Sequence, residues 1–317
     1  MIKNKGTLSI ILLSYQSEKN LIPICYLIKE EMNAEGIPFE IIIIDDGSTD
    51  RSFEIALQLA NEHPYIRSYR FSKNYSSPYS QMAGFSLAKG ACAIPMADDL
   101  QRPIDTVVKM YRLWEEGAKI VIGYRKSRND GFMSDFYSSL YYRMMNKFSN
   151  VRFPPGGADG FLADREILDI LVHKISHNNT SPIIEVLQLG FDPVFIPFDR
   201  PKNTSQSRWT MKKKIKLALN TFFSASTFPI RMVTSLGLFM FSLAIILSII
   251  VIYAKIFTDN SLFGLPVPGW ATIILVTMFF NGMTMLSLGI IAEYIWRIFE
   301  EVKGKPPYII RNKEEKS

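Results

Sequence analysis

The chain has 317 residues, of which 48% are hydrophobic, and a formal net charge of +6 from 36 basic and 30 acidic residues. This length allows one large domain with an appendage, or two small domains. No basic stripe is interleaved with aromatic residues, which disfavours nucleic acid as a partner. The two cysteines, Cys25 and Cys92, are too few for a disulfide framework and suit core positions in a reducing compartment.

The first 125 residues alternate short apolar runs with amphipathic stretches. Strand–helix alternation at this spacing predicts a mostly parallel, doubly wound α/β sheet. Ligands of such sheets bind beyond the carboxyl ends of the strands. Strands are expected over residues 8–13, 40–44, 66–71, 91–96 and 119–123, and helices over residues 20–34, 52–61, 80–88 and 104–115.

The hexapeptide DDGSTD, residues 45–50, follows an apolar run of four isoleucines. Gly47 supplies a tight turn, and one of the three residues after it can cap the next helix. The carboxylates of Asp45 and Asp46 can accept hydrogen bonds from a ribose or from the imide N–H of a uracil. A helix cap without a ligand is the alternative, but the whole hexapeptide after a buried strand favours a nucleotide site.

A second acidic pair, Asp98 and Asp99, lies in the stretch ADDLQ, residues 97–101, after another apolar run. Two adjacent carboxylates at a strand end repel each other, and a bound cation would relieve this repulsion. Mg²⁺ and Mn²⁺ take carboxylate and amide oxygens and bridge to a diphosphate. The alternative is a capped helix start at Asp98 or Asp99, with Pro103 in the first turn.

The pattern changes after residue 125. Residues 134–149 are rich in aromatics and methionine, which fits a helix on the bilayer surface or one packed on the sheet. A turn-rich stretch, residues 153–160, leads into a further strand and helix, and residues 192–198 form the last expected strand. Residues 210–226 combine a lysine cluster with an apolar face, as in a helix of the headgroup layer.

Two C-terminal segments, residues 232–254 and 270–292, lack Asp, Glu, Lys and Arg. Each would be about 34 Å long as a helix, against roughly 30 Å for the hydrocarbon core. A pair of buried core helices is the alternative. Basic residues precede the first segment and follow the second, which predicts cytoplasmic ends. Because the apolar run 8–13 is too short for a signal peptide, the large domain is expected in the cytoplasm.

Together the two acidic stretches resemble glycosyltransferase family 2, whose catalytic domain has the Rossmann-like GT-A fold. Its D-A-D-L-Q motif aligns with residues 97–101, so Ala97 replaces the first aspartate. The resemblance makes Asp99 a catalytic residue that holds Mg²⁺ or Mn²⁺ together with Gln101. Asp98 falls at the variable middle position, where a contact with the ribose or the sugar is expected, the alternative being that it only adds negative potential. Of the opening motif only Tyr15 matches, and it joins Asp45 and Asp46 as a nucleotide ligand.

The resemblance extends to polyprenyl-phosphate glycosyltransferases. Residues 124–128 resemble their R-x-x-R segment, and arginine suits this role because its planar fork binds phosphate bidentately. Residues 198–200 resemble F-D-R, residues 206–209 resemble Q-T-K-W, and residues 290–310 follow their C-terminal motif. The implied ligands of the acceptor phosphate are Arg125, Arg128, Arg200, Ser207 and Arg208.

Residues 153–165, FPPGGADGFLADR, are similar to the motif I-P-P-x-x-G-D-F-R-L-x-D-R of the same enzymes. This places Asp159 at the acidic position of the proposed base. Gly160 and Phe161 stand where Phe and Arg are usual, so one positive charge of the motif is missing.

The resemblance implies an inverting enzyme of a bacterial inner membrane. It would transfer a sugar from a nucleoside-diphosphate sugar to a polyprenyl phosphate such as undecaprenyl phosphate. The expected donor is UDP-linked, with UDP-glucose as one example. The lipid-linked sugar would serve cell-surface glycan modification, and a homo-oligomer is expected. A processive polysaccharide synthase and a degenerate, non-catalytic nucleotide-sugar binding subunit remain as alternatives. The expected parts are a catalytic GT-A domain over 1–209, a juxtamembrane helix over 210–229, two transmembrane helices over 230–296 and a cytoplasmic tail over 297–317.

Overall fold

The computed structural model describes residues 6–99, 102–126, 143, 147, 153–154, 157–175, 181–199, 228–257, 261–262, 265–266, 269–303 and 306–311. The chain divides into two compact units, which are described separately. The first comprises Met1–Ala225 with Lys305–Ser317, and the second is Ser226–Gly304.

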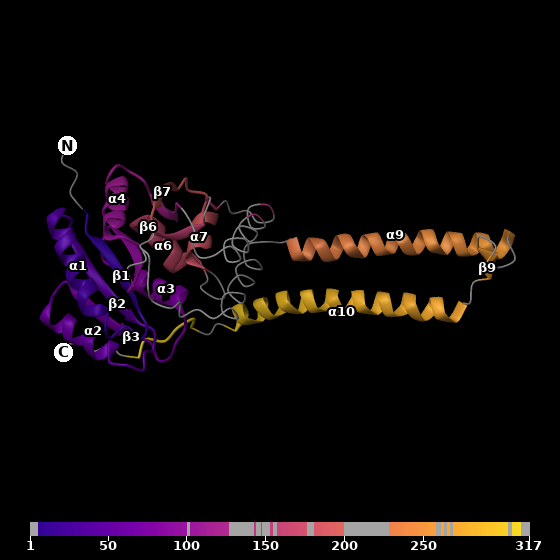
Figure 1. Ribbon diagram of the computed structural model, residues 1–317, viewed down its shortest axis with the longest axis horizontal. Coiled ribbons are helices and arrows are strands. Elements are labelled where there is room, and N and C mark those ends of the chain that lie inside the picture. The colour runs from indigo at the N-terminus through magenta and orange to yellow at the C-terminus, as the bar shows by residue number, and fades with distance from the viewer. Residues whose placement is uncertain are drawn as a thin grey trace. The chain divides into compact units, whose positions relative to one another are not determined.

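A sheet forms the centre of the first unit (Figure 1). It has seven strands in the order β3-β2-β1-β4-β6-β5-β7. β6 runs antiparallel to its neighbours β4 and β5, and the other pairs of neighbouring strands are parallel. The predicted α/β sheet is therefore confirmed. The strands are β1 (Leu8–Ser14), β2 (Phe39–Asp45), β3 (Ile66–Arg70), β4 (Cys92–Ala97), β5 (Ile120–Arg125), β6 (Ala158–Asp164) and β7 (Val194–Phe198).

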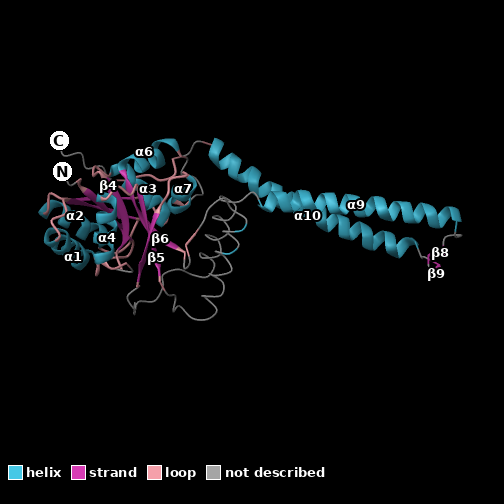
Figure 2. Cartoon of the chain, turned by 90° about the horizontal axis from the view of Figure 1, so that it is seen from above, coloured by secondary structure: helices cyan, strands magenta, loops and turns pink. Residues whose placement is uncertain are grey.

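Helices cover both faces of this sheet (Figure 2). The isoleucine run of β2 shows why: Ile41 and Ile43 are buried against one helical layer, and Ile42 and Ile44 against the other. A strand buried on both faces has no polar alternation. One layer contains α1 (Leu21–Ala34), α2 (Ser52–Glu62) and α4 (Ile104–Glu115), and the other contains α3 (Ser77–Leu87), α6 (Arg165–Lys174) and α7 (Pro182–Gln188).

The expected elements agree with the observed ones to within three residues at each end. The largest difference in a helix is at α3, which begins at Ser77 instead of residue 80, with proline in its first turn. β6 begins at Ala158, so the prediction that residues 158–160 belong to a turn is wrong. Cys25 and Cys92 are buried free thiols, as expected. The helices expected near residues 134–149 and over 210–226 lie outside the described residues.

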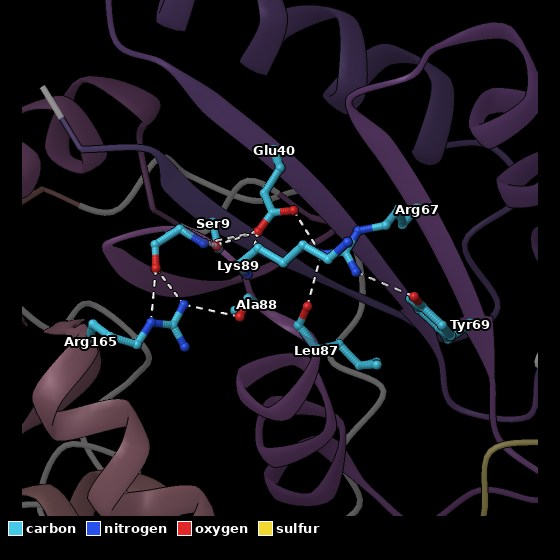
Figure 3. A network of polar contacts seen from close by, with 9 residues as sticks. Ser9, Glu40, Arg67, Tyr69, Leu87, Ala88, Lys89 and Arg165 are labelled. Carbon is cyan, nitrogen blue, oxygen red and sulfur yellow. Dashed lines mark hydrogen bonds and ion pairs between the residues drawn. The ribbon is translucent and has the colours of Figure 1, made fainter.

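A polar network ties the amino ends of the strands together, at the edge of the sheet opposite the predicted site (Figure 3). The carboxylate of Glu40 accepts hydrogen bonds from Ser9 Oγ (2.6 Å), from Arg67 Nη2 (2.7 Å) and from two backbone amides of the loop 88–90 (2.7 and 3.2 Å). Arg165 donates to carbonyl oxygens of the same loop. The network therefore fixes the entry into β4.

The second unit consists mainly of two long helices that lie side by side, α9 (Phe228–Phe257) and α10 (Gly269–Val302) (Figures 1 and 2). The short strands β8 (Ser261–Leu262) and β9 (Leu265–Pro266) pair between them. Both apolar segments are thus helical. Within the described residues, however, no helix combines the length and the hydropathy of a membrane span. Membrane insertion therefore stays a prediction.

Candidate functional site

The carboxyl ends of β2, β1 and β4 bring the two acidic stretches to one edge of the sheet. Ser14, the last residue of β1, is in register with Asp45 of β2. On the other side of β1, Leu13 is in register with Ala97, and Asp98 follows directly. Asp45 and Asp98 therefore flank the end of β1, although 53 positions separate them in the sequence. This convergence of the acidic stretches is the arrangement that the sequence predicted.

Asp45 is fully buried and only partly satisfied by the protein. Its Oδ2 accepts a hydrogen bond from the amide of Ser48 (3.1 Å) and lies 3.4 Å from Nε of Arg70. Burial raises the pKa of Asp45, and the bonds from Ser48 and the charge of Arg70 offset this only in part. Within the described residues, Oδ1 of Asp45 and Oγ of Ser14 are buried without a hydrogen-bond partner. An N–H donor of a ligand would satisfy this carboxylate.

Asp46 holds a neighbouring loop. Its two oxygens accept the backbone amides of Tyr75 (2.6 Å) and Ser76 (2.9 Å), which precede α3. Ser76 has a φ of 81°, a conformation that a non-glycine residue keeps only where its surroundings enforce it. Gly47, with a φ of 69°, packs on the same loop, and a Cβ there would lie 2.6 Å from the carbonyl carbon of Lys73. A direct contact of Asp46 with a nucleotide stays a prediction.

Tyr15 lies in the loop after β1, with 36% of its surface exposed. This loop is joined to the loop after β2: the amide of Gln16 donates to Ser48 Oγ (3.0 Å) and the amide of Ser17 donates to Ser52 Oγ (2.6 Å). The hydroxyl groups of Ser48 in the second loop and of Ser52 at the start of α2 therefore hold the loop after β1, which the sequence analysis did not anticipate.

Asp98 and Asp99 follow the end of β4, where Asp98 is buried and Asp99 half-buried. The N-cap of α4 is Pro103, without a side-chain cap, so the alternative of an aspartate-capped helix is wrong. Within the described residues no three His, Cys, Asp or Glu side chains are grouped to hold a metal. Mg²⁺ is typically held by one or two carboxylates together with substrate phosphates and water. The donor set at this strand end fits that pattern, although Gln101 lies outside the described residues.

Asp159 and Arg125, two predicted site residues, form an ion pair. They lie on the antiparallel neighbours β6 and β5, and Arg125 Nε donates to Asp159 Oδ2 at 2.7 Å. The side chain of Arg125 is 15% exposed and that of Asp159 is 35% exposed, so a ligand can reach the carboxylate.

Arg102 supports this pair, and the sequence analysis missed it. Its guanidinium donates to the carbonyl oxygens of Asp159 and of Pro95 (3.4 Å in the second case). The same group fills the space beside Gly160, whose φ is 89°, and a Cβ on Gly160 would overlap Nη2. The sequence signal for this contact was Gly160, which stands where the motif has phenylalanine and leaves space for another side chain.

Five further predicted site residues cannot be placed. The metal ligand Gln101 and four of the acceptor-phosphate ligands lie outside the described residues. Those four are Arg128, Arg200, Ser207 and Arg208.

The fold is that of a doubly wound α/β protein in which two acidic stretches meet at the carboxyl ends of the central strands. The sequence profile of the family described as glycosyl transferase family 2 matches residues 9–169, about half of the chain. The chain belongs to this family and is a glycosyltransferase.

The curated relatives match nearly the whole chain. The putative glycosyltransferase CsbB of Bacillus subtilis (strain 168) is 32% identical over 308 residues, covering 97% of this chain and 92% of its own. The bactoprenol glucosyl transferase of Shigella phage SfV is 29% identical over 304 residues, covering 95% and 97%. Among solved structures, glucosyl-3-phosphoglycerate synthase from Mycobacterium tuberculosis, crystallised with Mn²⁺, UDP and phosphoglyceric acid, is 14% identical. It has a TM-score of 0.46 over 68% of this chain and 75% of its own.

Proposed function

We propose that this glycosyltransferase transfers one sugar from a nucleoside-diphosphate sugar to a polyprenyl phosphate such as undecaprenyl phosphate. A UDP-linked donor is proposed, with UDP-glucose as the first candidate. The observation that carries the proposal is the alignment, along nearly the whole chain, with relatives named bactoprenol glucosyl transferase. The product, a lipid-linked monosaccharide, would be used to modify cell-surface glycans.

The donor is proposed to bind at the carboxyl ends of β2, β1 and β4. Asp45 accepts the imide N–H of the uracil, which is supported by its buried and unsatisfied Oδ1. Tyr15 borders the nucleotide, Asp98 faces the ribose or the sugar, and Asp46 holds the loop that encloses the site.

The divalent cation is proposed to be held by Asp99 and Gln101 with the donor diphosphate. A bound Mg²⁺ or Mn²⁺ would stabilise the negative charge of the departing nucleoside diphosphate. The fit rests on the donor set, a carboxylate and an amide oxygen after a strand end.

The chemistry is a single displacement. An oxygen of the acceptor phosphate attacks the anomeric carbon, the bond from that carbon to the diphosphate oxygen breaks, and UDP leaves with the bonding electrons. The anomeric configuration is inverted. Because the second pKa of a phosphate monoester is about 6, the acceptor is already mostly dianionic at neutral pH and needs little help from a base. Asp159 is therefore proposed to orient the acceptor and to take up any residual proton.

Arginines are proposed to offset the repulsion between the two anionic substrates. Arg125, whose Nε donates to Asp159, is proposed to contact the acceptor phosphate, because a guanidinium carries five N–H donors in a planar fork. The other proposed ligands of this phosphate are Arg128, Arg200, Ser207 and Arg208.

The apolar segments in α9 and α10 are proposed to insert into the bacterial inner membrane, with the sheet unit in the cytoplasm. The support is their composition, the basic residues that flank them and the lipid nature of the acceptor. Resistance of the full chain to extraction by alkaline carbonate tests this, and release into the soluble fraction would contradict it. Assembly as a homo-oligomer belongs to the same proposal.

The decisive experiment uses the purified full chain in detergent, undecaprenyl phosphate and labelled nucleotide sugars, with Mg²⁺, Mn²⁺ or a chelator. Label that enters the organic phase and is released by mild acid would support the proposal and identify the sugar. Label in a long polymer would instead favour a processive synthase. Nucleotide binding without transfer, whatever metal is present, would indicate a non-catalytic binding subunit.

A further inference from the structure

The C-terminal segment of the first unit, residues 306–311, pairs with the chain at the carboxyl end of the edge strand β3 (Figure 1). Phe71, just after β3, forms an antiparallel bridge with Ile310. The amide of Ser72 donates to the carbonyl of Ile309 (3.0 Å), and the amide of Arg311 donates to the carbonyl of Arg70 (2.8 Å). The carboxyl end of this edge strand is thus paired with residues more than 200 positions away in the sequence.

Tyr308 provides the side-chain contact of this segment. Its ring stacks on that of Phe71, with the ring centroids 5.2 Å apart and an interplanar angle of 26°. Its hydroxyl lies 3.3 Å from Oγ of Ser86 on α3. Phe71 is 1% exposed, so the stack with Tyr308 lies over a buried ring.

Phe71 connects the C-terminal segment to the loop that Asp46 holds at the proposed donor site. The Phe71 ring also contacts the ring of Tyr75, edge-on with the centroids 5.4 Å apart. The backbone amide of Tyr75 donates to Asp46 at 2.6 Å. One path therefore leads from the tyrosine of the C-terminal segment through two aromatic rings to the aspartate that holds the loop before α3.

A second path runs through Arg70. Its carbonyl accepts the amide of Arg311, while its guanidinium lies 3.4 Å from Asp45 Oδ2 and donates to the carbonyl of Ser48 at 2.6 Å. The backbone of Arg70 is thus held by the C-terminal segment, and its side chain contacts the buried aspartate expected to bind the nucleotide base.

We infer that residues 306–311 are a positioning element of the donor site: by pairing with residues 70–72 they hold Arg70 and the loop before α3 in the arrangement that binds the nucleoside diphosphate. This inference rests on the proposed function, which assigns that edge of the sheet to the donor. The segment itself does not touch the reacting atoms.

The physical reason is the cost of ordering the loop. Ser76 sits at a φ of 81°, and such a conformation persists only while the surrounding contacts enforce it. If the C-terminal segment is released, residues 70–72 lose two backbone hydrogen bonds and Phe71 loses its stacked ring. The loop before α3 then samples more conformations in the unbound protein. Binding of the nucleotide must order this loop again, and the entropic cost lowers the affinity for the nucleotide.

The test compares three variants of the full chain. Tyr308→Ala removes the stack, and Tyr308→Phe keeps the stack but removes the hydroxyl. Ile309→Ala is the matched control, because the Ile309 side chain is 51% exposed while its backbone carbonyl stays in place. We expect Tyr308→Ala to raise the Kd of UDP and the KM of the donor about tenfold. The KM of the lipid acceptor should change by less than about twofold, and Ile309→Ala should match the parent.

A second measurement needs no variant. If donor binding and docking of the segment are coupled, UDP should slow hydrogen exchange at the amides of Ser72 and Arg311 in the parent chain. Equal UDP affinity in Tyr308→Ala and the parent would overturn the inference, as would unchanged exchange at these two amides. A parallel loss of donor affinity, acceptor affinity and thermal stability would show a general stabilising role and overturn it as well. Failure of the proposed function would look different, because it is seen in the parent chain itself: no UDP binding, UDP binding without transfer, or label in a long polymer.

Discussion

Replacing Gly160 by alanine should destabilise the chain strongly, because two effects add at one position. Gly160 has a φ of 89°, where an L side chain costs about 1–2 kcal/mol. The new Cβ would overlap Nη2 of Arg102 and force the guanidinium away from the carbonyl oxygens of Asp159 and Pro95. Each hydrogen bond from a charged donor contributes about 1.5 kcal/mol or more. The expected loss in the free energy of unfolding is therefore about 4 kcal/mol.

Gly190→Ala is the matched control for this substitution. Gly190 has a φ of 78°, but a Cβ there would meet no atom within 4 Å. Gly190→Ala should therefore cost only the backbone part, about 1–2 kcal/mol. Urea unfolding of the full chain in detergent, followed by tryptophan fluorescence, measures both values, since Trp114 lies in the first unit and donates to Asp164.

A double-mutant cycle isolates the part that belongs to Arg102. In an Arg102→Ala background the overlap is gone, so Gly160→Ala should cost as little there as Gly190→Ala costs in the parent. If Gly160→Ala costs the same in the presence and absence of the Arg102 side chain, the reasoning about this contact is refuted. A total loss below about 1 kcal/mol would refute the estimate for the backbone as well.

Two further predictions follow from the polar contacts. Glu40→Gln should lower the free energy of unfolding by about 2–3 kcal/mol by breaking its ion pair with Arg67, whereas Glu54→Gln, in an exposed pair, should change it by less than about 0.5 kcal/mol. Burial raises the pKa of Glu40, but hydrogen bonds from Ser9, Lys89 and Arg67 lower it below its ordinary value. The stabilisation is therefore present above the unfolded-state pKa and lost as the pH falls through the folded-state pKa, so parent and Glu40→Gln unfolding curves should converge in acid. Asp159→Asn should reduce kcat less than Asp99→Asn, because a dianionic phosphate needs little base; equal losses in matched kinetics would count against this.

Local patterns in the sequence were sufficient for most of the sheet. The isoleucine run of β2 is buried on both faces of the sheet. A continuous apolar run of this length, with amphipathic helices before and after it, is typical of a strand between two helical layers. The aspartates that follow β2 and β4 were placed at one sheet edge because parallel strands present their carboxyl ends together. These features depend on residues close together in the chain and on the regular connection of strands and helices.

The tertiary structure alone decided how the side chains at that edge are used. Asp46 binds the loop before α3, Arg102 fills the space beside Gly160, and residues 306–311 pair with the chain at the carboxyl end of β3. None of these contacts follows from periodicity or from the spacing of a motif, because each joins segments whose distance is set by the packing of the whole sheet. The sequence by itself determined the elements, the family and the acidic strand ends. The contacts between distant segments are seen only in the tertiary structure, because they depend on which backbone groups and which spaces the assembled sheet leaves open.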